Sequence, residues 1–265
     1  MGKKIFVAGA SGVVGRRLCR LLVEDGWLVS GSTRSQDKVP MLRDLGVNPV
    51  VVDAFDEALL NRVIGEIQPA MVIHQLTDLP PALDPARMPE AVVRNARIRE
   101  VGTCNLLAAC VAAGVKRIVA QSIAFAYSPG PLPYDEDSPL NTNSSDCAGI
   151  TARGVASLEQ QVLRAPLYGI VLRYGKLYGP GTGFDHAPIG GAVHVDAAAD
   201  AARLALILGT KGVYNIAETD GTISSVKAAN ALGWTSDFRI DESQQHSRTA
   251  QQGAPADANS GAAEL

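Results

Sequence analysis

A glycine-rich turn near the amino terminus constrains this chain more than any other segment. Gly9, Gly12 and Gly15 follow a short apolar run, residues 4–8, and precede an amphipathic run, residues 14–24. Gly9 permits a tight turn from strand to helix, Gly12 lets the backbone approach a pyrophosphate, and Gly15 lets the helix pack closely on a sheet. The first amides of a helix have no partner within it and can bind phosphate oxygens. The segment therefore predicts a dinucleotide site.

Apolar, β-branched runs alternate with helical patterns through the first two-thirds of the chain, which predicts successive βαβ units and a parallel sheet. The predicted fold class is α/β, a doubly wound parallel (Rossmann) sheet with a small substrate-side portion at the carboxyl end. We expect a dinucleotide-binding core over 1–175, a substrate-side segment with returning core elements over 176–242, and a disordered tail over 243–265. Strands are expected at 4–8, 27–32, 48–52, 70–74, 117–121, 169–173 and 213–216, and helices at 14–24, 38–44, 57–66, 89–113, 152–164 and 197–208.

Composition argues against several classes of partner. The chain has 265 residues, a net charge of −3 and four cysteines. It carries no basic block, so we expect neither nucleic acid nor a membrane surface as a partner. The cysteines form no C-x-x-C pair and show no metal-ligand spacing with histidine, which predicts reduced thiols, no metal site and a cytoplasmic location. No apolar run is long enough to span a membrane.

The end of the second predicted strand bears on the choice of cofactor. A chain selective for NAD commonly places a carboxylate there to accept from the ribose hydroxyls, but this chain has Thr33 and Arg34. Arg34 is suited to pair with a 2′-phosphate, and Lys38 adds charge nearby. We therefore predict NADP, with NAD as the alternative. Asp53 ends the third strand and either accepts from the adenine amino group or caps the next helix.

Five sequence blocks follow one another in a familiar order: Gly9 to Gly15; Asn95 with 102–109; 113–119; 172–181; and 194–196 with 212–216. Together they resemble the extended short-chain dehydrogenase/reductase superfamily, in its NAD-dependent epimerase/dehydratase group. The resemblance runs from residue 3 to about residue 234 and implies an NAD(P)-dependent oxidoreductase or epimerase/dehydratase. The implied substrate is small, polar or sugar-like, with a carbonyl or hydroxyl group, and the implied assembly is a homodimer.

The resemblance also implies a Tyr-x-x-x-Lys-x-x-x-Glu pattern on the helix after residue 146, and the chain departs from it. Glu159 matches the final glutamate, but the lysine position holds Val155 and the tyrosine position holds Thr151. No tyrosine in the chain has a lysine four residues later. The usual tyrosine acid and its lysine partner are therefore absent.

Three other side chains are candidates for the proton donor. Ser122 follows the fifth strand, and its alternative role is a hydrogen bond at the strand end. Tyr174 ends the sixth strand, and its alternative role is packing beneath the pocket. His74 ends the fourth strand, where a structural hydrogen bond is the alternative to proton transfer. His186 and His194 lie in or beside the predicted substrate segment and are not predicted to be catalytic.

Two functions remain open at this stage. One is an NADP-dependent oxidoreductase or epimerase-like enzyme with a nonstandard proton donor, and the other is an inactive protein that senses the NADP pool. Ser122 and Tyr174 are the predicted catalytic residues. The predicted cofactor-binding residues are Gly9, Ser11, Gly12, Val13, Val14, Gly15, Thr33, Arg34, Lys38, Asp53, Ala54, His74, Gln75, Leu76, Ser122 and Tyr174.

Overall fold

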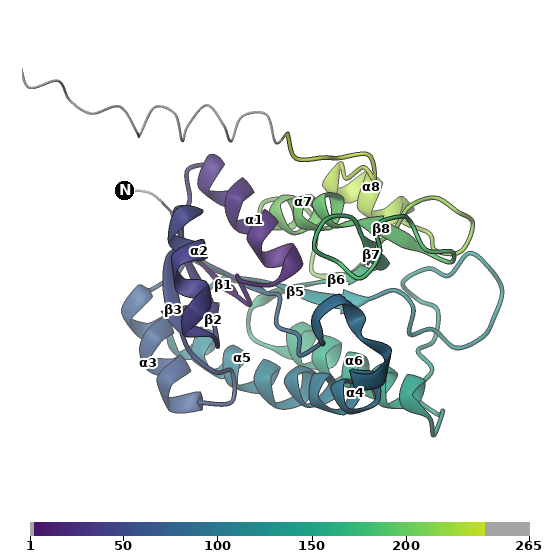
Figure 1. Cartoon of the computed structure of the whole chain (residues 1–265), viewed down its shortest axis with the longest axis horizontal. Helices are drawn as coiled ribbons and strands as arrows, with labels where there is room; N and C mark the ends of the chain where they lie inside the picture. The colour runs from purple at the N-terminus through teal and green to yellow at the C-terminus, as the bar shows by residue number, and fades with distance from the viewer. Residues whose placement is uncertain (1–2, 242–265) are drawn as a thin grey trace, which may run out of the picture.

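A seven-stranded parallel sheet forms the middle layer of the structure (Figure 1). The computed structural model describes residues 3–241. The strand order is β3-β2-β1-β4-β5-β6-β9, so the chain starts at an inner strand and winds outward in both directions. The fold class predicted from the sequence is confirmed. The strands are β1 (Lys4–Ala8), β2 (Leu28–Thr33), β3 (Asn48–Val51), β4 (Met71–His74), β5 (Arg117–Ile123), β6 (Tyr168–Tyr174) and β9 (Gly212–Ile216).

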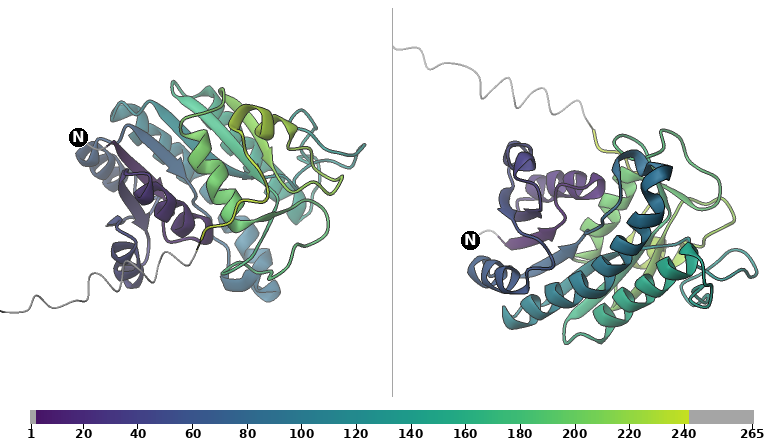
Figure 2. Two further views of the ribbon diagram at one scale, coloured as in Figure 1. Left: turned by 90° about the horizontal axis from the view of Figure 1, so that it is seen from above. Right: turned by 60° about the horizontal axis from the view of Figure 1, so that its bottom comes forward.

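Helices cover both faces of this sheet (Figures 1 and 2). Each face has its own buried core, because successive side chains of a strand point to opposite faces. In β1, Ile5 and Val7 pack into one core, while Phe6 and Ala8 pack into the other. One face carries α1 (Val13–Glu24), α2 (Val39–Asp44), α7 (Val195–Ala205) and α8 (Val226–Leu232). The other carries α3 (Glu57–Ile67), α4 (Met88–Arg97), α5 (Thr103–Ala112) and α6 (Cys147–Arg164).

The long helix predicted over 89–113 is interrupted in the structure. Between α4 and α5 the chain forms a π-helical segment, η4 (Ile98–Gly102). The widened turn accommodates one extra residue per turn without ending the helix, and such segments are frequent at functional sites. Hydrophobic periodicity does not distinguish such a segment from a continuous α-helix. The view on the right of Figure 2 shows the α4 to α5 run lying along α6.

Helix α6 begins at Cys147 rather than at residue 152. The Asp146 side chain accepts a hydrogen bond of 3.0 Å from the Gly149 amide and so caps the helix five residues earlier than predicted. Capping of this kind favours Asp immediately before the first turn. The earlier start gives Thr151 helical geometry within the first turns of α6.

Beyond β6 the chain adds a two-stranded parallel sheet, β7 (Lys176–Tyr178) with β8 (Ala192–His194), and then returns to the main sheet through α7 and β9. The segment between β7 and β8, residues 179–191, is the glycine- and proline-rich connection. Residues 243–265, predicted to be a tail, lie outside the described residues. Within residues 3–241, no helix is long and apolar enough to cross a membrane.

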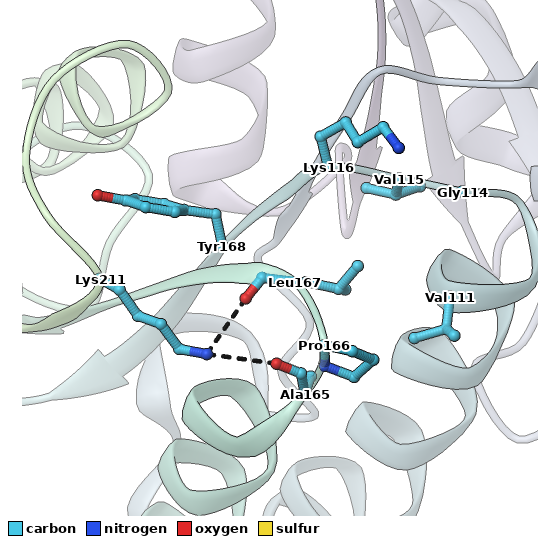
Figure 3. Close-up of a pocket in the computed structure, with 9 residues that line it drawn as sticks. All are labelled: Val111, Gly114, Val115, Lys116, Ala165, Pro166, Leu167, Tyr168 and Lys211. Atoms are coloured by element: carbon cyan, nitrogen blue, oxygen red, sulfur yellow. Dashed lines mark hydrogen bonds between the residues drawn. The ribbon is translucent and has the colours of Figure 1, made fainter.

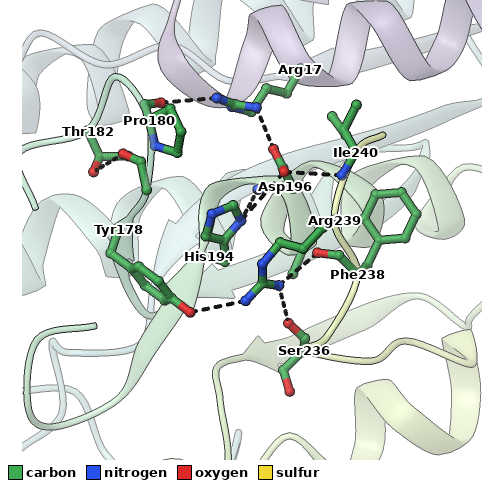
Figure 4. A network of polar contacts seen from close by, with 12 residues as sticks. Arg17, Tyr178, Pro180, Thr182, His194, Asp196, Ser236, Phe238, Arg239 and Ile240 are labelled. Atoms are coloured by element: carbon green, nitrogen blue, oxygen red, sulfur yellow. Dashed lines mark hydrogen bonds and ion pairs between the residues drawn. The ribbon is translucent and has the colours of Figure 1, made fainter. Parts of the chain in front are cut away.

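A buried carboxylate ties three distant segments of this fold together (Figure 4). Asp196, at the start of α7, accepts from Arg17 of α1 at 2.6 Å and from the Ile240 amide at 3.1 Å. Arg17 also donates to the Pro180 carbonyl oxygen at 3.2 Å. The first helix, the segment 179–191 and the carboxyl end of the described chain therefore share one ionic contact.

Replacing Asp196 should destabilise the whole domain. Asp196→Ala leaves Arg17 without its counter-ion and the Ile240 amide without an acceptor, and loss of one partner of a buried pair costs about 3 kcal/mol or more. Urea unfolding measures the loss. Asp185→Ala, at an exposed position, is the matched control and should change the unfolding free energy by less than about 0.5 kcal/mol. Equal stability of the two variants would contradict this account of the contact.

Candidate functional site

The predicted dinucleotide turn has the close backbone packing that its glycines imply. Gly9 has φ +83°, and a Cβ atom there would lie 2.6 Å from the Gln75 carbonyl oxygen. A Cβ at Gly15 would collide with the Gly9 carbonyl oxygen. Gly12 is the N-cap of α1 and contributes no side-chain hydrogen bond to the first turn. The residues present therefore fit a pyrophosphate at the amino end of α1, bound by main-chain amides.

Hydroxyl groups brace this turn against the end of β2. The Gly9 amide donates to Ser32 Oγ at 3.1 Å, and Ser11 Oγ donates to Thr33 Oγ1 at 3.0 Å. These contacts bring two segments of the predicted cofactor set, 9–15 and 33–34, side by side. Farther along, Asp53 Oδ1 accepts from the Phe55 amide at 2.9 Å, and the Ala54 carbonyl oxygen accepts from Asn105 at 3.0 Å.

Arg34 lies at the end of β2, where the sequence predicts it, but it has a protein partner. Its guanidinium donates to Asp78 at 3.0 Å, and Arg94 of α4 also pairs with Asp78, at 3.4 Å. The hydrogen bond from Arg34 holds the pKa of Asp78 below its ordinary value. Arg34 remains 44% exposed, and Lys38 is exposed nearby. Asp78 was missed by the sequence reasoning, since nothing in its local pattern points to a residue 44 positions away.

His74 is a buried, neutral hydrogen-bonding residue at the end of β4. Its Nδ1 accepts from the Leu76 amide at 3.2 Å, so Nε2 carries the proton and donates to Thr103 Oγ1 at 2.9 Å. Burial lowers the pKa of His74 to about 4, with a further contribution from the charge of Arg99. Both ring nitrogens are therefore engaged within the protein.

Tyr174 and Gln75 join β6 to β4 beneath the turn. Gln75 Nε2 donates to the Tyr174 hydroxyl at 3.2 Å, and Tyr174 is only 1% exposed. Burial raises the pKa of Tyr174 well above its ordinary value, which makes its proton harder to release. Gln75 Oε1 is buried and has no hydrogen-bond partner among the described residues. The two side chains form a polar contact inside an otherwise apolar region.

Ser122 belongs to a buried ionic cluster shared by β5, β6 and α6. Its hydroxyl donates to Glu159 Oε1 at 2.8 Å. Arg173 donates to both oxygens of Glu159, at 2.8 Å and 2.7 Å, and also to the Tyr127 hydroxyl at 3.0 Å. Glu159, which matches the final glutamate of the family pattern, therefore holds Ser122 and Arg173 in fixed positions. Both oxygens of the carboxylate already accept hydrogen bonds.

On α6, the two positions where the resemblance implies tyrosine and lysine carry no acid or cation. Thr151 is half-buried, and Val155 is fully buried in an apolar cluster with Ile123, Ala126 and Ala152. Val155 thus fills the inward face of the helix with an aliphatic side chain. Within residues 3–241, no cluster of three or more potential metal ligands is present. His186 is exposed, while His194 caps α7 by accepting from the Asp196 amide.

A hollow lies at the edge of the sheet formed by the amino ends of the strands (Figure 3). Its volume is about 470 Å³, and it lies beside the amino ends of β5 and β6. Lys211 on its rim donates to the Ala165 and Leu167 carbonyl oxygens, so its ammonium is engaged. Ligands of open parallel sheets bind at the carboxyl ends of the strands, at the point where strand order reverses. Here that point lies between β1 and β4, beside Gly9 and Gln75, and we take it as the candidate site.

Comparison with known proteins identifies the class of this chain. A profile of the NAD dependent epimerase/dehydratase family matches residues 5–193. A 3-diazoavenalumate denitrifying reductase of a Streptomyces species is 41% identical over 229 residues, covering 85% of this chain and 71% of that protein. The chain belongs to the NAD-dependent epimerase/dehydratase family. It is an enzyme of the oxidoreductase and epimerase type.

Solved structures share the fold at low sequence identity. A UDP-glucose 4-epimerase of Thermotoga maritima, solved with UDP-glucose, has a TM-score of 0.71 at 19% identity, over 94% of this chain and 99% of that one. A UDP-glucose 4-epimerase of Thermus thermophilus, in complex with NAD, has a TM-score of 0.71 at 21% identity, over 95% and 100%. These likenesses support the fold described above.

Gly12→Ala tests the dinucleotide turn, with one close contact to which the turn must adjust by a few tenths of an ångström. Gly12 has φ −73°, which alanine adopts freely, and the nearest atom to a new Cβ is the Gly9 carbonyl oxygen at 3.3 Å. The methyl group would occupy space in front of the first amides of α1. We expect NADPH affinity, measured by calorimetry, to fall by about tenfold or more, equivalent to about 1.4 kcal/mol.

Gly65→Ala is the control for that variant. Gly65 lies in α3, and nothing is within 4 Å of a Cβ there. Replacing a glycine inside a helix by alanine stabilises by up to about 1 kcal/mol, and NADPH affinity should be unchanged. If Gly12→Ala bound NADPH as the wild type does, the phosphates would have to lie elsewhere.

Proposed function

We propose that this enzyme is an NADPH-dependent reductase that delivers hydride to a diazonium-type carbon, with release of dinitrogen. The observation that carries the proposal is that the three predicted proton donors, all among the described residues, are each buried and hydrogen-bonded within the protein. Each side chain that the sequence offers for proton transfer is held in a hydrogen bond within the protein, is buried, or both. The site therefore favours a substrate that accepts hydride without also taking up a proton.

The three candidate donors support this choice in different ways. The Ser122 hydroxyl donates a hydrogen bond to Glu159, which two hydrogen bonds from Arg173 hold in place. The Tyr174 hydroxyl accepts from Gln75 in a fully buried position, and its raised pKa opposes ionisation. His74 is neutral and fully buried, with both ring nitrogens bonded. Reduction of a carbonyl needs a proton for the developing alkoxide, and none of these groups is free to supply it.

A diazonium group removes that requirement. When bound, NADPH supplies a hydride. The hydride forms a new C–H bond at the carbon that carries nitrogen, the C–N bond breaks, and its electron pair leaves with N₂. The cation R–N₂⁺ plus hydride gives R–H plus N₂, so charge balances with no proton taken up or released. The chain must hold the hydride-donating carbon of NADPH beside the carbon that carries nitrogen, and it must exclude water.

The name of the Streptomyces relative points to the same chemistry. That protein is described as a denitrifying reductase acting on a 3-diazo compound, and it is 41% identical to this chain. At position 155, where the resemblance implies a lysine, Val155 contributes an apolar side chain.

A carbonyl reductase in which Tyr174 or Ser122 donates a proton is the second candidate. The contact of Gln75 with Tyr174 and that of Glu159 with Ser122 favour this second candidate, because they orient the two hydroxyl groups. Ser122 and Tyr174 therefore remain our proposed site residues, as groups beside the reacting carbon. The two candidates differ in whether their hydroxyl protons are needed for turnover.

Isotope and pH measurements separate the candidates. With benzenediazonium as the probe, NADPH deuterated at C4 should transfer deuterium to the ring carbon with release of N₂, and solvent deuterium should not enter that position. The rate of the hydride step should be flat between about pH 5.5 and 7.5, because no enzyme proton is transferred. Product carrying solvent deuterium at that carbon would rule the proposal out.

Tyr174→Phe and Ser122→Ala extend this test. For a diazonium substrate both variants should keep rates within about fivefold of the wild type, since neither hydroxyl proton is consumed. Loss of about a hundredfold or more in either variant, the magnitude ordinary for a general acid, would favour the carbonyl candidate. Gly12→Ala and a reaction without enzyme are the controls for uncatalysed reduction.

We further propose NADP as the preferred dinucleotide. Arg34 directly follows β2, at the strand end where a chain selective for NAD commonly places an acidic residue, and Lys38 is exposed close by in sequence. A 2′-phosphate would compete with Asp78 for the Arg34 guanidinium. Arg34 is half-exposed, so this exchange needs no change in the core.

Substitutions at Arg34 and Asp78 should have opposite effects on the affinity for NADPH. Arg34→Glu should weaken NADPH by about tenfold or more and leave NADH unchanged, because only the former presents the extra phosphate. Asp78→Asn should strengthen NADPH by releasing Arg34. Arg94→Gln, which also removes a partner of Asp78, is the control and should change neither affinity by more than about twofold. An equal loss of affinity for NADPH and NADH in Arg34→Glu would contradict the proposed preference for NADP.

A further inference from the structure

The π-helical segment η4 places a buried arginine beside the ionic cluster of α6. Arg99 is 6% exposed and lies against Gly154 of α6. A Cβ atom at position 154 would come 3.5 Å from Arg99 Cδ and 3.1 Å from the Ala96 Cα atom. Gly154 therefore lets α6 pack closely on Ala96, with the Arg99 stem in contact beside it.

The charge count of this buried region does not balance. It contains two guanidinium groups, Arg99 and Arg173, and one carboxylate, Glu159, which is hydrogen-bonded to Arg173 through both oxygens. Among the described residues the Arg99 side chain has no hydrogen-bonded partner; only its carbonyl oxygen is engaged, by Gln161 at 3.4 Å. A buried charge without a paired counter-ion costs several kcal/mol.

The pKa values of Arg99 and of its neighbour His74 both reflect the buried positive charge of Arg99. Burial lowers the pKa of Arg99 to about 10, although the charge of Glu159 acts in the opposite direction. The charge of Arg99 also helps to lower the pKa of His74. Arg99 therefore stands between the end of β4, which carries His74, and the inner face of α6.

We propose that Arg99 binds a carboxylate of the substrate. The proposal extends the reductase function above by adding an anionic group to its substrate class. The sheet order supports substrate rather than cofactor as the ligand: the phosphate-binding turn and Arg34 lie at β1 and β2, whereas Arg99 lies against α6 and near His74 at the end of β4. A single guanidinium suits a singly charged carboxylate better than a phosphate of about two charges.

Cinnamate and cinnamyl alcohol, which share a skeleton and differ in the carboxylate, are the probes for this site. Calorimetry on the protein with NADP⁺ bound should show cinnamate binding about tenfold or more tightly than the alcohol. Arg99→Met should abolish that difference, and Arg99→Lys should keep part of it. Arg97→Met, at an exposed position two residues away, is the matched control and should behave as the wild type.

Thermal unfolding gives an independent readout. Without ligand, Arg99→Met should melt at the same temperature as the wild type or higher, because it removes a buried charge without a counter-ion. A purely structural arginine would instead give a lower melting temperature and an unchanged preference for cinnamate, which would overturn the proposal. If Arg99→Met does not fold, the wild type alone still tests the proposal. Equal affinity of the wild type for cinnamate and cinnamyl alcohol would overturn it. Neither probe carries a diazo group, so these results stand apart from the test of the reductase reaction.

Discussion

The bidentate contact between Arg173 and Glu159 is the interaction on which the rest of the site depends. It is buried, and it joins α6 to β6 while Ser122 joins β5 to the same carboxylate. Arg173 also reaches the Tyr127 hydroxyl and the Glu136 carbonyl oxygen, which attach the long segment after β5 to the sheet. Because a buried pair is costly to break by removing one partner, this geometry is held rigidly. It fixes the position of the inner face of α6. Because Glu159 is hydrogen-bonded to Arg173 through both oxygens, Arg99 remains as a second positive charge in this region.

The site binds and orients with little means of moving protons. Side chains that carry acid-base chemistry in other proteins serve here as structural hydrogen-bonding groups, with His74 held neutral by burial and Tyr174 held by Gln75. Val155 adds an aliphatic surface at the position where the resemblance implies a cation. In the proposed function, such a site acts on electrophiles that are already activated when they arrive. The protein would then contribute proximity, exclusion of water and charge recognition rather than acid catalysis.

Much of the fold was predictable from the sequence, because it rests on local signals. The strand and helix order follows from periodicity, and the glycine turn follows from steric limits that Gly9 and Gly15 satisfy. The π-helical segment was not predictable, since Arg99 continues an ordinary helical pattern. The partners of Arg34 and Tyr174 were missed because they are 44 and 99 residues away, a separation that only the folded chain closes. The start of α6 was placed too late because the capping role of Asp146 was overlooked.

The Asp196 contact makes the two ends of the described chain interdependent. Arg17 belongs to the first helix, and the Ile240 amide lies one residue before the last described position. A chain that stopped before Ile240 would leave one oxygen of a buried carboxylate without its amide donor, directly beneath the helix whose amino end faces the phosphates. The contact between α1 and α7 therefore has its full set of hydrogen bonds only when the chain extends to Ile240. A truncation of the last few described residues would thus be felt at the first helix, more than 200 positions away in the sequence.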